Sequence, residues 1–495
     1  MTALTMALEA GQPVRHSTYG DGRIVRLLGS MAVVDFMGEE IDVEVDELEV
    51  TRQIGQSTES MDGGSAAPSA AKVAFRKSYE AMVLGVVPPD PEELIRLTIG
   101  GRKREADVRK WLKAARTRGL CKVVFGYYGS GKSHYLNFAR CVALTEGWVV
   151  AFLELDPAAA DPAKPNLVYN QIMQRLQFPK RAGVGDEEGV GAFLAEVRRH
   201  WRGKALRANP QLQGSPWLRT AIEALVLHGD TQSEDYQVVA QYIAGAPNTV
   251  TTLRQIARLH GLGSQIQAMR STGETAAAYV HNLAVIDGLC RGMGYKGLCV
   301  IMDEAEHYRN LSTRRRERAS NFLDVLGRAA HRPNPTLPSP EINDLDRVLG
   351  DMLLDEGPHF ALFVGLTRSW EAAGGTDGLH ESCVLLHDEG DQIDLTSPSV
   401  NDYRDWCTEF LARFAIHYRE EMVAILDPVD RDGIVDQLTN GFASLDGPPN
   451  SSLRHWIKLA TLAPATLFAN PEMTIVDLQK VLSQAINRLD LPWED

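Results

Sequence analysis

Residues 123–133 read VVFGYYGSGKS, and the rest of the chain can be interpreted from this run. An apolar segment at 123–125 leads into Gly126-x-x-x-x-Gly131-Lys132-Ser133, and a helical pattern follows from residue 134. Strand, glycine-rich loop and helix in this order are typical of a phosphate-binding P-loop. The sequence therefore predicts an α/β fold with a parallel sheet that carries a P-loop at one strand end.

The loop residues are of the types that nucleotide binding requires. Glycines let backbone N–H groups converge on phosphate oxygens at the positive end of a helix dipole. The lysine can reach the β- and γ-phosphates, and the serine hydroxyl can ligate Mg²⁺. The predicted binding residues are Gly126, Tyr127, Tyr128, Gly129, Ser130, Gly131, Lys132, Ser133 and His134.

A second motif follows far downstream. Residues 297–306 read GLCVIMDEAE, an apolar strand that ends in Asp303 and Glu304. An aspartate at such a strand tip can hold Mg²⁺ through water, and the adjacent glutamate can polarise a water toward the γ-phosphate. The presence of both carboxylates favours hydrolysis over binding alone.

A third strand is expected at 359–366, HFALFVGL, and it ends in Thr367-Arg368. In P-loop ATPases of the AAA+/STAND group, a polar residue after the acidic strand senses the γ-phosphate and positions water. Thr367 occupies that position, and Arg368 is either a charge sensor or a surface arginine. The expected ligands are accordingly ATP and Mg²⁺.

Composition agrees with an ordinary globular protein. The chain has 495 residues, enough for about two to four domains. It has no apolar run near the ~20 residues that cross a bilayer, and its N-terminus lacks the features of a secretory signal. Six cysteines are scattered without a C-x-x-C pair, which indicates reduced thiols. A cytoplasmic location is expected.

The charge is uneven. A net charge of −14 argues against a protein coated in nucleic acid, yet basic residues crowd 102–122 and 314–318. Such patches are compatible with contact to double-stranded DNA, or with a solvated helix face. Some of the arginines are also candidates to serve ATP in a neighbouring subunit, so a homo-oligomer is expected.

The N-terminal segment is expected to be a separate domain at residues 1–50. Short alternating runs separated by glycine turns predict a small antiparallel β-barrel. It resembles the SH3-like or tudor-like modules of some bacterial helicases and transcription factors in the pattern Val14, His16, Tyr19, Gly20, Gly22 and Ile24. Residues 51–72 are rich in Ser, Gly and Ala without periodicity and predict a flexible linker.

The remainder divides into an ATPase core at 73–398 and a C-terminal helical lid at 399–495. Apolar residues at helical spacing predict a large helical insertion over about 157–296. The segment Ile99-Gly100-Gly101-Arg102 resembles the entry of initiator-type AAA+ ATPases, which lies near the adenine. The turn after Gly447-Pro448-Pro449 resembles the one that carries a second sensor arginine, here Arg454.

Together these motifs resemble the P-loop ATPases of BREX-type bacterial anti-phage systems, the BrxC/BrxD group, with BrxD closer in size. The resemblance covers about 74–490 and is carried by VVFGYYGSGKSHYL, TAAAYVHNLAVIDGLCRGMGYKGLCVIMDEAEHYRN and HFALFVGLTRS. It implies ATP-dependent work in phage defence, on DNA or on partner proteins such as a helicase.

Two other functions remain open. One is a nucleotide-dependent scaffold that binds ATP and assembles partners with little turnover, against which Glu304 and Thr367 argue. The other is a DNA-loading ATPase of replication or transposition. An initiator would normally end in a winged helix, and the roughly 30 residues that follow the proposed lid turn and its helix are too few for that module by size.

Overall fold

The structure is a computed structural model of the whole chain, which divides into two units, Met1–Ala67 and Pro68–Asp495. In the first unit the structure describes five short strands between residues 13 and 50. In the second it describes residues 69–127, 129–180, 188–201, 212, 215, 217–227, 231–246, 250–262, 276–306, 311–331, 360–367, 392–395, 398–444 and 452–489.

The first unit contains an antiparallel sheet in which Val33, Val34 and Val43 are buried. The strands pair in the order β4-β3-β2-β1-β5 and are β1 (Pro13–His16), β2 (Gly20–Leu28), β3 (Met31–Phe36), β4 (Glu39–Glu44) and β5 (Leu48–Val50). Among these described strands no pairing joins β4 to β5. The barrel expected at 1–50 is therefore, in its described part, an open five-stranded sheet.

The second unit begins with a helix earlier than the sequence indicated. Helix α1 (Ala70–Val83) starts inside the linker expected at 51–72, most of which lies outside the described residues. The Ser69 side chain caps it by accepting a hydrogen bond from Lys72 N at 3.2 Å. A serine cap followed by two alanines favours a helix start over continued coil.

The central sheet of the second unit is parallel except at one edge. Its order is β11-β6-β10-β9-β7-β8, with β6 (Leu120–Gly126), β7 (Val149–Glu154), β8 (Leu176–Gln177), β9 (Leu298–Asp303), β10 (Ala361–Thr367) and β11 (Gln392–Asp394). Every residue of β6 and β9 is buried, as continuous apolar runs in a parallel sheet require. Only β8 runs antiparallel, against β7.

The strand order places the predicted motifs at one edge of the sheet. Strand β10 lies between the P-loop strand β6 and the acidic strand β9, so Thr367 pairs in register with Gly126. Parallel strands end at the same edge, where α/β proteins bind ligands. The carboxyl ends of β6, β10 and β9 therefore converge.

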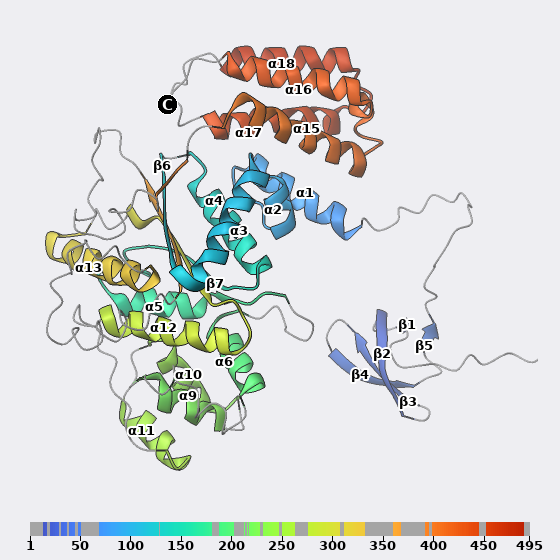
Figure 1. Cartoon of the computed structure of the whole chain (residues 1–495). Helices are drawn as coiled ribbons and strands as arrows, with labels where there is room; N and C mark the ends of the chain where they lie inside the picture. Colours follow the sequence, from blue (N-terminus) through green and yellow to red (C-terminus); the bar gives the residue numbers. More distant parts are fainter. Residues whose placement is uncertain are drawn as a thin grey trace, which may run out of the picture. The chain divides into compact units, whose positions relative to one another are not determined.

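Helices cover both faces of this sheet (Figure 1). On one face α3 (Gly101–Arg118) and α4 (Lys132–Thr145) pack on alternate strand residues such as Val124 and Ile301. On the other lie α5 (Pro165–Gln174), α12 (Ala276–Gly292) and α13 (Thr313–Ala330), which enclose Val123 and Val300. The α/β fold predicted from the P-loop is confirmed at this level.

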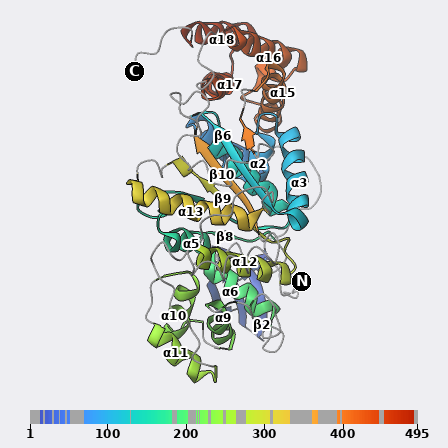
Figure 2. The same ribbon diagram turned by 60° about the vertical axis from the view of Figure 1, so that its left-hand side comes forward.

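The chain between β7 and β9 is mostly helical in its described part. After α5 and the short β8 it forms α6 (Gly189–His200), α9 (Leu218–Leu227), α10 (Glu234–Ile243), α11 (Val250–Leu259) and α12. Figure 2 shows α9, α10 and α11 grouped beyond the sheet. Strand β8 is a new element in this segment, because two residues are too few to produce a pattern.

The C-terminal helices form a core of their own and share it with α1. These helices are α15 (Val400–His417), α16 (Pro428–Ala443), α17 (Ser452–Ala469) and α18 (Ile475–Leu489). The rings of Phe75 in α1 and Phe414 in α15 meet edge to face at 4.8 Å. The Trp406 indole N–H donates to the Leu97 carbonyl at 2.9 Å, which joins α15 to the end of α2 (Pro91–Arg96).

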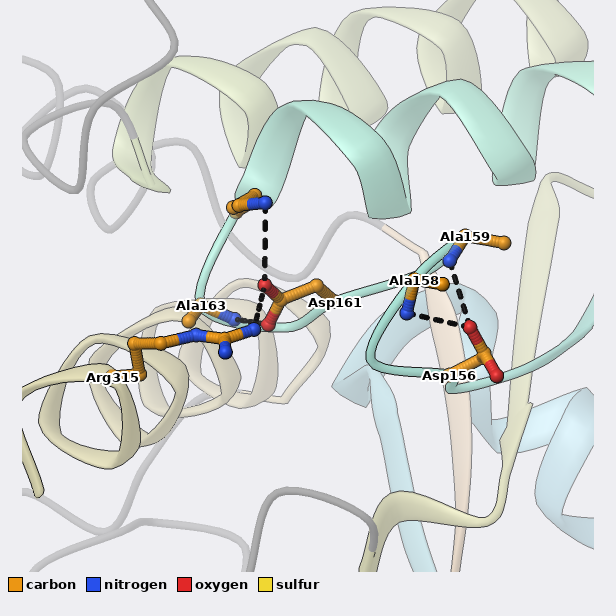
Figure 3. A network of polar contacts seen from close by, with 7 residues as sticks. Asp156, Ala158, Ala159, Asp161, Ala163 and Arg315 are labelled. Atoms are coloured by element: carbon orange, nitrogen blue, oxygen red, sulfur yellow. Dashed lines mark hydrogen bonds and ion pairs between the residues drawn. The ribbon is translucent and has the colours of Figure 1, made fainter. Parts of the chain in front are cut away.

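An ion pair between a partly exposed arginine and a buried aspartate fixes the start of α13 against the loop after β7 (Figure 3). Arg315 Nη2 lies 2.6 Å from Asp161 Oδ2, and the Asp161 side chain is fully buried. Asp161 Oδ1 also accepts from Ala163 N at 2.9 Å. In the same loop Asp156 Oδ1 accepts from Ala158 N and Ala159 N at 2.6 and 2.8 Å. The loop beside the strand ends is thus held by its own carboxylates.

We expect Arg315→Ala to lower the free energy of unfolding by about 2 kcal/mol, because it leaves a buried carboxylate without its guanidinium partner. Arg316→Ala removes an exposed arginine one position along and should change stability by less than about 0.5 kcal/mol. Urea unfolding of both variants measures the difference. Equal losses would mean that the Asp161 pair contributes no net stability.

Candidate functional site

The P-loop leaves no room for side chains at two of its glycines. A Cβ at Gly126 would lie 2.2 Å from Ser130 Oγ, so the loop folds back directly over the strand end. Gly131 caps α4 with a φ of 90°, and a Cβ there would lie 2.9 Å from Leu453 Cδ2. The left-handed backbone and the close approach of the lid both favour glycine. Tyr128 lies outside the described residues.

Lys132 is a charged group in a nearly buried position. It is the first residue of α4 and only 8% exposed. In the part of the chain that the structure describes, no carboxylate pairs with its ammonium. A buried cation without a partner is costly, and a bound anion would remove that cost. The first turn of α4 also offers N–H groups that have no partner within the helix. This end of the loop therefore suits a phosphate.

Asp303, at the end of β9, is a buried acidic residue whose carboxylate is only partly hydrogen-bonded. The residue is 1% exposed, and its Oδ1 accepts from Glu304 N at 2.9 Å. Its Oδ2 is buried and has no hydrogen-bond partner among the described residues. A carboxylate oxygen without a partner and the hydroxyl of the P-loop serine are both oxygen ligands of the kind that a hard cation prefers. Asp303 and Ser133 could thus hold Mg²⁺.

No other metal site competes with this one in the described part of the chain. There, no group of three or more His, Cys, Asp or Glu side chains could hold an ion. Magnesium is usually bound by one or two protein oxygens together with waters and substrate phosphates, not by an all-protein cage. A sparse donor set therefore fits a metal that arrives with a nucleotide.

Glu304 has an unusual backbone conformation. Its φ is 58°, and it is the one non-glycine residue with a positive φ in the described ranges. Such conformations cost about 1–3 kcal/mol and cluster at functional sites. The fold therefore holds Glu304 in one orientation, on the wall of the cavity described next.

A cavity of about 330 Å³ lies between the P-loop and the start of α17. One part of its wall is polar and includes Gly129, Ser130, Gly131, Lys132, Ser133, His134, Glu304, Arg104, Arg454 and Lys458. The other part is apolar and includes Met82, Val86, Val87, Pro88, Leu97, Ile99 and Ile457. The cavity has the volume of a small-molecule site, and its wall is polar on one part and apolar on the other. It therefore fits a ligand with a polyanionic end and a flat apolar end.

Thr367 stands at the end of β10 and is held by a glutamate that the sequence analysis did not single out. Its N–H donates to Glu306 Oε2 at 3.2 Å, and its hydroxyl donates to Glu306 Oε1. Glu306 lies in the turn after the acidic strand. The sequence signal was present, because GLCVIMDEAE contains a third carboxylate, but only the fold shows which residue it contacts.

The three predicted arginine positions have different outcomes. Arg454, at the start of α17, lines the cavity, and Arg368 lies outside the described residues. Arg102 is exposed and does not line the cavity. Arg104, one helical half-turn further, does so instead: burial lowers the pKa of its guanidinium, and it lies over the Tyr135 ring at 5.7 Å.

The comparison with known families agrees with this geometry. Residues 75–329, more than half of the chain, match the model of the family described as BREX system ATP-binding protein BrxC/D. The chain belongs to this family. The match spans the P-loop and the acidic strand of this BrxC/D-family chain, and the family description implies that the chain binds ATP. No curated protein matches the sequence.

The matched region stops at residue 329, before β10 and the lid. Thr367 and Arg454 therefore depend on the structure alone for their place beside the P-loop. Within the described residues, no helix is long and apolar enough to span a bilayer.

Proposed function

We propose that this BrxC/D-family protein hydrolyses ATP, as an AAA+-like ATPase of a phage-defence system. The observation that carries the proposal is Glu304, which is held in a strained conformation on the wall of the cavity that the P-loop also lines. A protein that only binds ATP has no need of a carboxylate oriented there at a cost in stability. This favours turnover over the scaffold function.

The residues divide the work of hydrolysis among them. Lys132 neutralises the β- and γ-phosphates, and the backbone N–H groups of the first turn of α4 orient them. Bound Mg²⁺, held by Ser133 and Asp303, would neutralise phosphate charge as the γ-phosphoryl group departs. Glu304 accepts a proton from the attacking water, and the β-phosphate oxygen takes up the bonding electrons of the bond that breaks.

We infer that Thr367 orients the attacking water. Its hydroxyl donates to Glu306 in this structure. A threonine hydroxyl has a single proton but two lone pairs, so it can still accept a hydrogen bond from water while it donates to Glu306. Glu306 thereby sets the direction in which the Thr367 hydroxyl is free to accept.

Two substitutions separate ATP binding from turnover. We expect Lys132→Ala to weaken ATP binding about tenfold or more, since hydrogen bonds to charged groups contribute about 1.5–3 kcal/mol. Glu304→Gln keeps the shape of the side chain but cannot take a proton, so it should bind ATP normally and turn over about 10²–10⁴-fold more slowly. Calorimetric binding and phosphate release measure the two effects. An unchanged steady-state rate in Glu304→Gln would exclude it as the base.

A second observation favours DNA as the substrate on which ATP turnover acts. Besides Arg109, the exposed side of α3 carries five cations: Arg102, Lys103, Lys110, Lys113 and Arg116. No described carboxylate forms an ion pair with any of them, whereas Arg109 on the same helix pairs with Glu105 and Glu146. In a chain of net charge −14, such a concentrated positive face suits the phosphate backbone of a duplex.

The same helix reaches the nucleotide site. Arg104 lies on α3 between these cations and lines the cavity. A duplex that binds the outer face of α3 would therefore act on the helix that carries Arg104. This supports coupling between DNA contact and ATP turnover.

We expect the triple substitution Lys103→Ala, Lys110→Ala and Lys113→Ala to weaken binding of double-stranded DNA and to reduce its salt dependence. Each lost phosphate contact should lower the slope of log K against log salt by about 0.9. The matched control replaces three scattered exposed lysines, Lys77, Lys296 and Lys480, with alanine and has the same net charge. Fluorescence anisotropy at several salt concentrations gives the slopes. Identical slopes in the two triple variants would remove α3 as the DNA surface.

We also propose that the active species is an oligomer in which an arginine acts across subunits. Arg315 forms an ion pair with Asp161, but Arg314 and Arg316 on either side of it are exposed. They stand at the start of α13, the first described helix after the acidic strand, and pair with no described carboxylate. An arginine supplied by a neighbouring subunit can accelerate phosphoryl transfer about 10³-fold or more.

We expect the double variant Arg314→Ala, Arg316→Ala to be nearly inactive alone, and Glu304→Gln to be inactive for a different reason. Mixed together, they should recover part of the activity, because a site with intact Glu304 can receive arginines from its Glu304→Gln neighbour. Steady-state ATPase of the mixture against each variant measures this. Activity that stays at the sum of the separate variants would contradict an arginine acting in trans.

A further inference from the structure

His134 follows the P-loop serine and forms a specific contact with Thr98, in the turn after α2. Its Nε2 lies 2.8 Å from Thr98 Oγ1, and Thr98 Oγ1 lies 2.6 Å from the Leu94 carbonyl oxygen. Thr98 and His134 both line the cavity, and Leu97 and Ile99 on either side of Thr98 belong to its apolar wall. The imidazole thus stands where the phosphate-binding and apolar parts of the wall meet.

The geometry determines which imidazole nitrogen carries the proton. Thr98 Oγ1 has one proton, and it must point at the Leu94 carbonyl, because two acceptor oxygens at 2.6 Å would otherwise repel each other. The hydroxyl oxygen can then only accept from the ring. His134 Nε2 therefore carries the hydrogen and donates to Thr98, which leaves a lone pair on Nδ1.

A neutral imidazole that donates through Nε2 keeps the lone pair of Nδ1 available to accept a hydrogen bond. Nδ1 has no partner among the described residues, and it is not among the polar atoms that are sealed from solvent. The cavity wall thus presents one fixed hydrogen-bond acceptor at this point.

We propose that His134 Nδ1 reads the nucleotide base by accepting a hydrogen bond from the exocyclic amine of adenine, and that Thr98 is the positioning residue that fixes the tautomer. The proposal rests on the ATP site described above. A phosphate offers no donor to a lone pair, so Nδ1 must face the base or the ribose. The neighbouring apolar wall, with Met82, Val86 and Ile99, suits a flat aromatic base.

The consequence is discrimination between bases. A 6-oxo purine presents an acceptor where adenine presents an amine, so its oxygen would face the Nδ1 lone pair. Sites built to hydrogen-bond one group reject an analogue that lacks it, because a buried polar atom is left unpaired. Affinity for adenine over hypoxanthine nucleotides should thus be a property of this pair of side chains.

Binding of diphosphates to the wild-type full-length chain tests this without any need for turnover. We expect isothermal calorimetry to show that IDP binds at least about tenfold more weakly than ADP, while 2′-deoxy-ADP binds within about threefold of ADP. Equal affinities for ADP and IDP would overturn the proposal. A loss confined to 2′-deoxy-ADP would also overturn it, because it would assign Nδ1 to the ribose.

Two variants then test whether the preference for ADP over IDP comes from His134 and Thr98. His134→Gln offers both a donor and an acceptor, so the ratio of IDP to ADP dissociation constants should fall toward one. Thr98→Val keeps the shape but frees the tautomer, and it should reduce the ratio in the same direction. His260→Gln, at the far end of the helical insertion, is the matched control and should leave the ratio unchanged. A wild-type ratio that persists in both site variants would overturn the assignment.

The outcomes distinguish this inference from the ATP site itself. Failure of every nucleotide to bind the wild-type chain would reject the ATP site and the base contact together. Tight binding of ADP with no preference over IDP would reject the base contact alone and leave the proposed hydrolysis untouched.

Discussion

The loop between β6 and α4 can close only because Gly126 has no side chain. Ser130 Oγ occupies the space that a Cβ would need. This tight closure brings α4 to its start at Lys132, directly after the strand end, and so buries an ammonium group without a partner. Strand β9 ends with a buried carboxylate oxygen that is also unpaired. The two groups do not neutralise each other, so the site is complementary to a phosphate and a cation together.

Local motifs were sufficient to predict the central part of this site. The P-loop, the acidic strand and the following strand each consist of an apolar run and its adjoining polar residues, so all of the information is contiguous in the sequence. Their convergence also follows from a general rule, since parallel strands end at one edge. The position of β10 between β6 and β9 is a matter of pairing that no single segment specifies.

The residues that the sequence did not reveal are those defined by contacts between distant segments. Thr98 and His134 become a pair only when α2 packs against α4, and Glu306 is tied to Thr367 across 61 residues. The sequence predicted Arg102 because the resemblance at Ile99-Gly100-Gly101-Arg102 ends there, and it did not single out Arg104. Because an α-helix has about 3.6 residues per turn, moving two positions along the sequence brings the side chain to the opposite face of the helix. The start of α1 depended on Ser69, one small residue in an otherwise featureless segment.

The shared core of α1 and the C-terminal helices has a consequence for the order of folding. Tyr79 in α1 reaches the Thr461 carbonyl, a separation of 382 residues, and Glu93 pairs with Arg413. During synthesis α1 therefore emerges long before the helices that cover its aromatic side. Contacts so distant in sequence form late, because a long loop must close first. Met82 of α1 and Ile457 of α17 both line the cavity, so the wall of the nucleotide site is complete only after the start of α17 has left the ribosome. A nascent chain should therefore be unable to bind a nucleotide until the start of α17 has been synthesised and has packed against the P-loop.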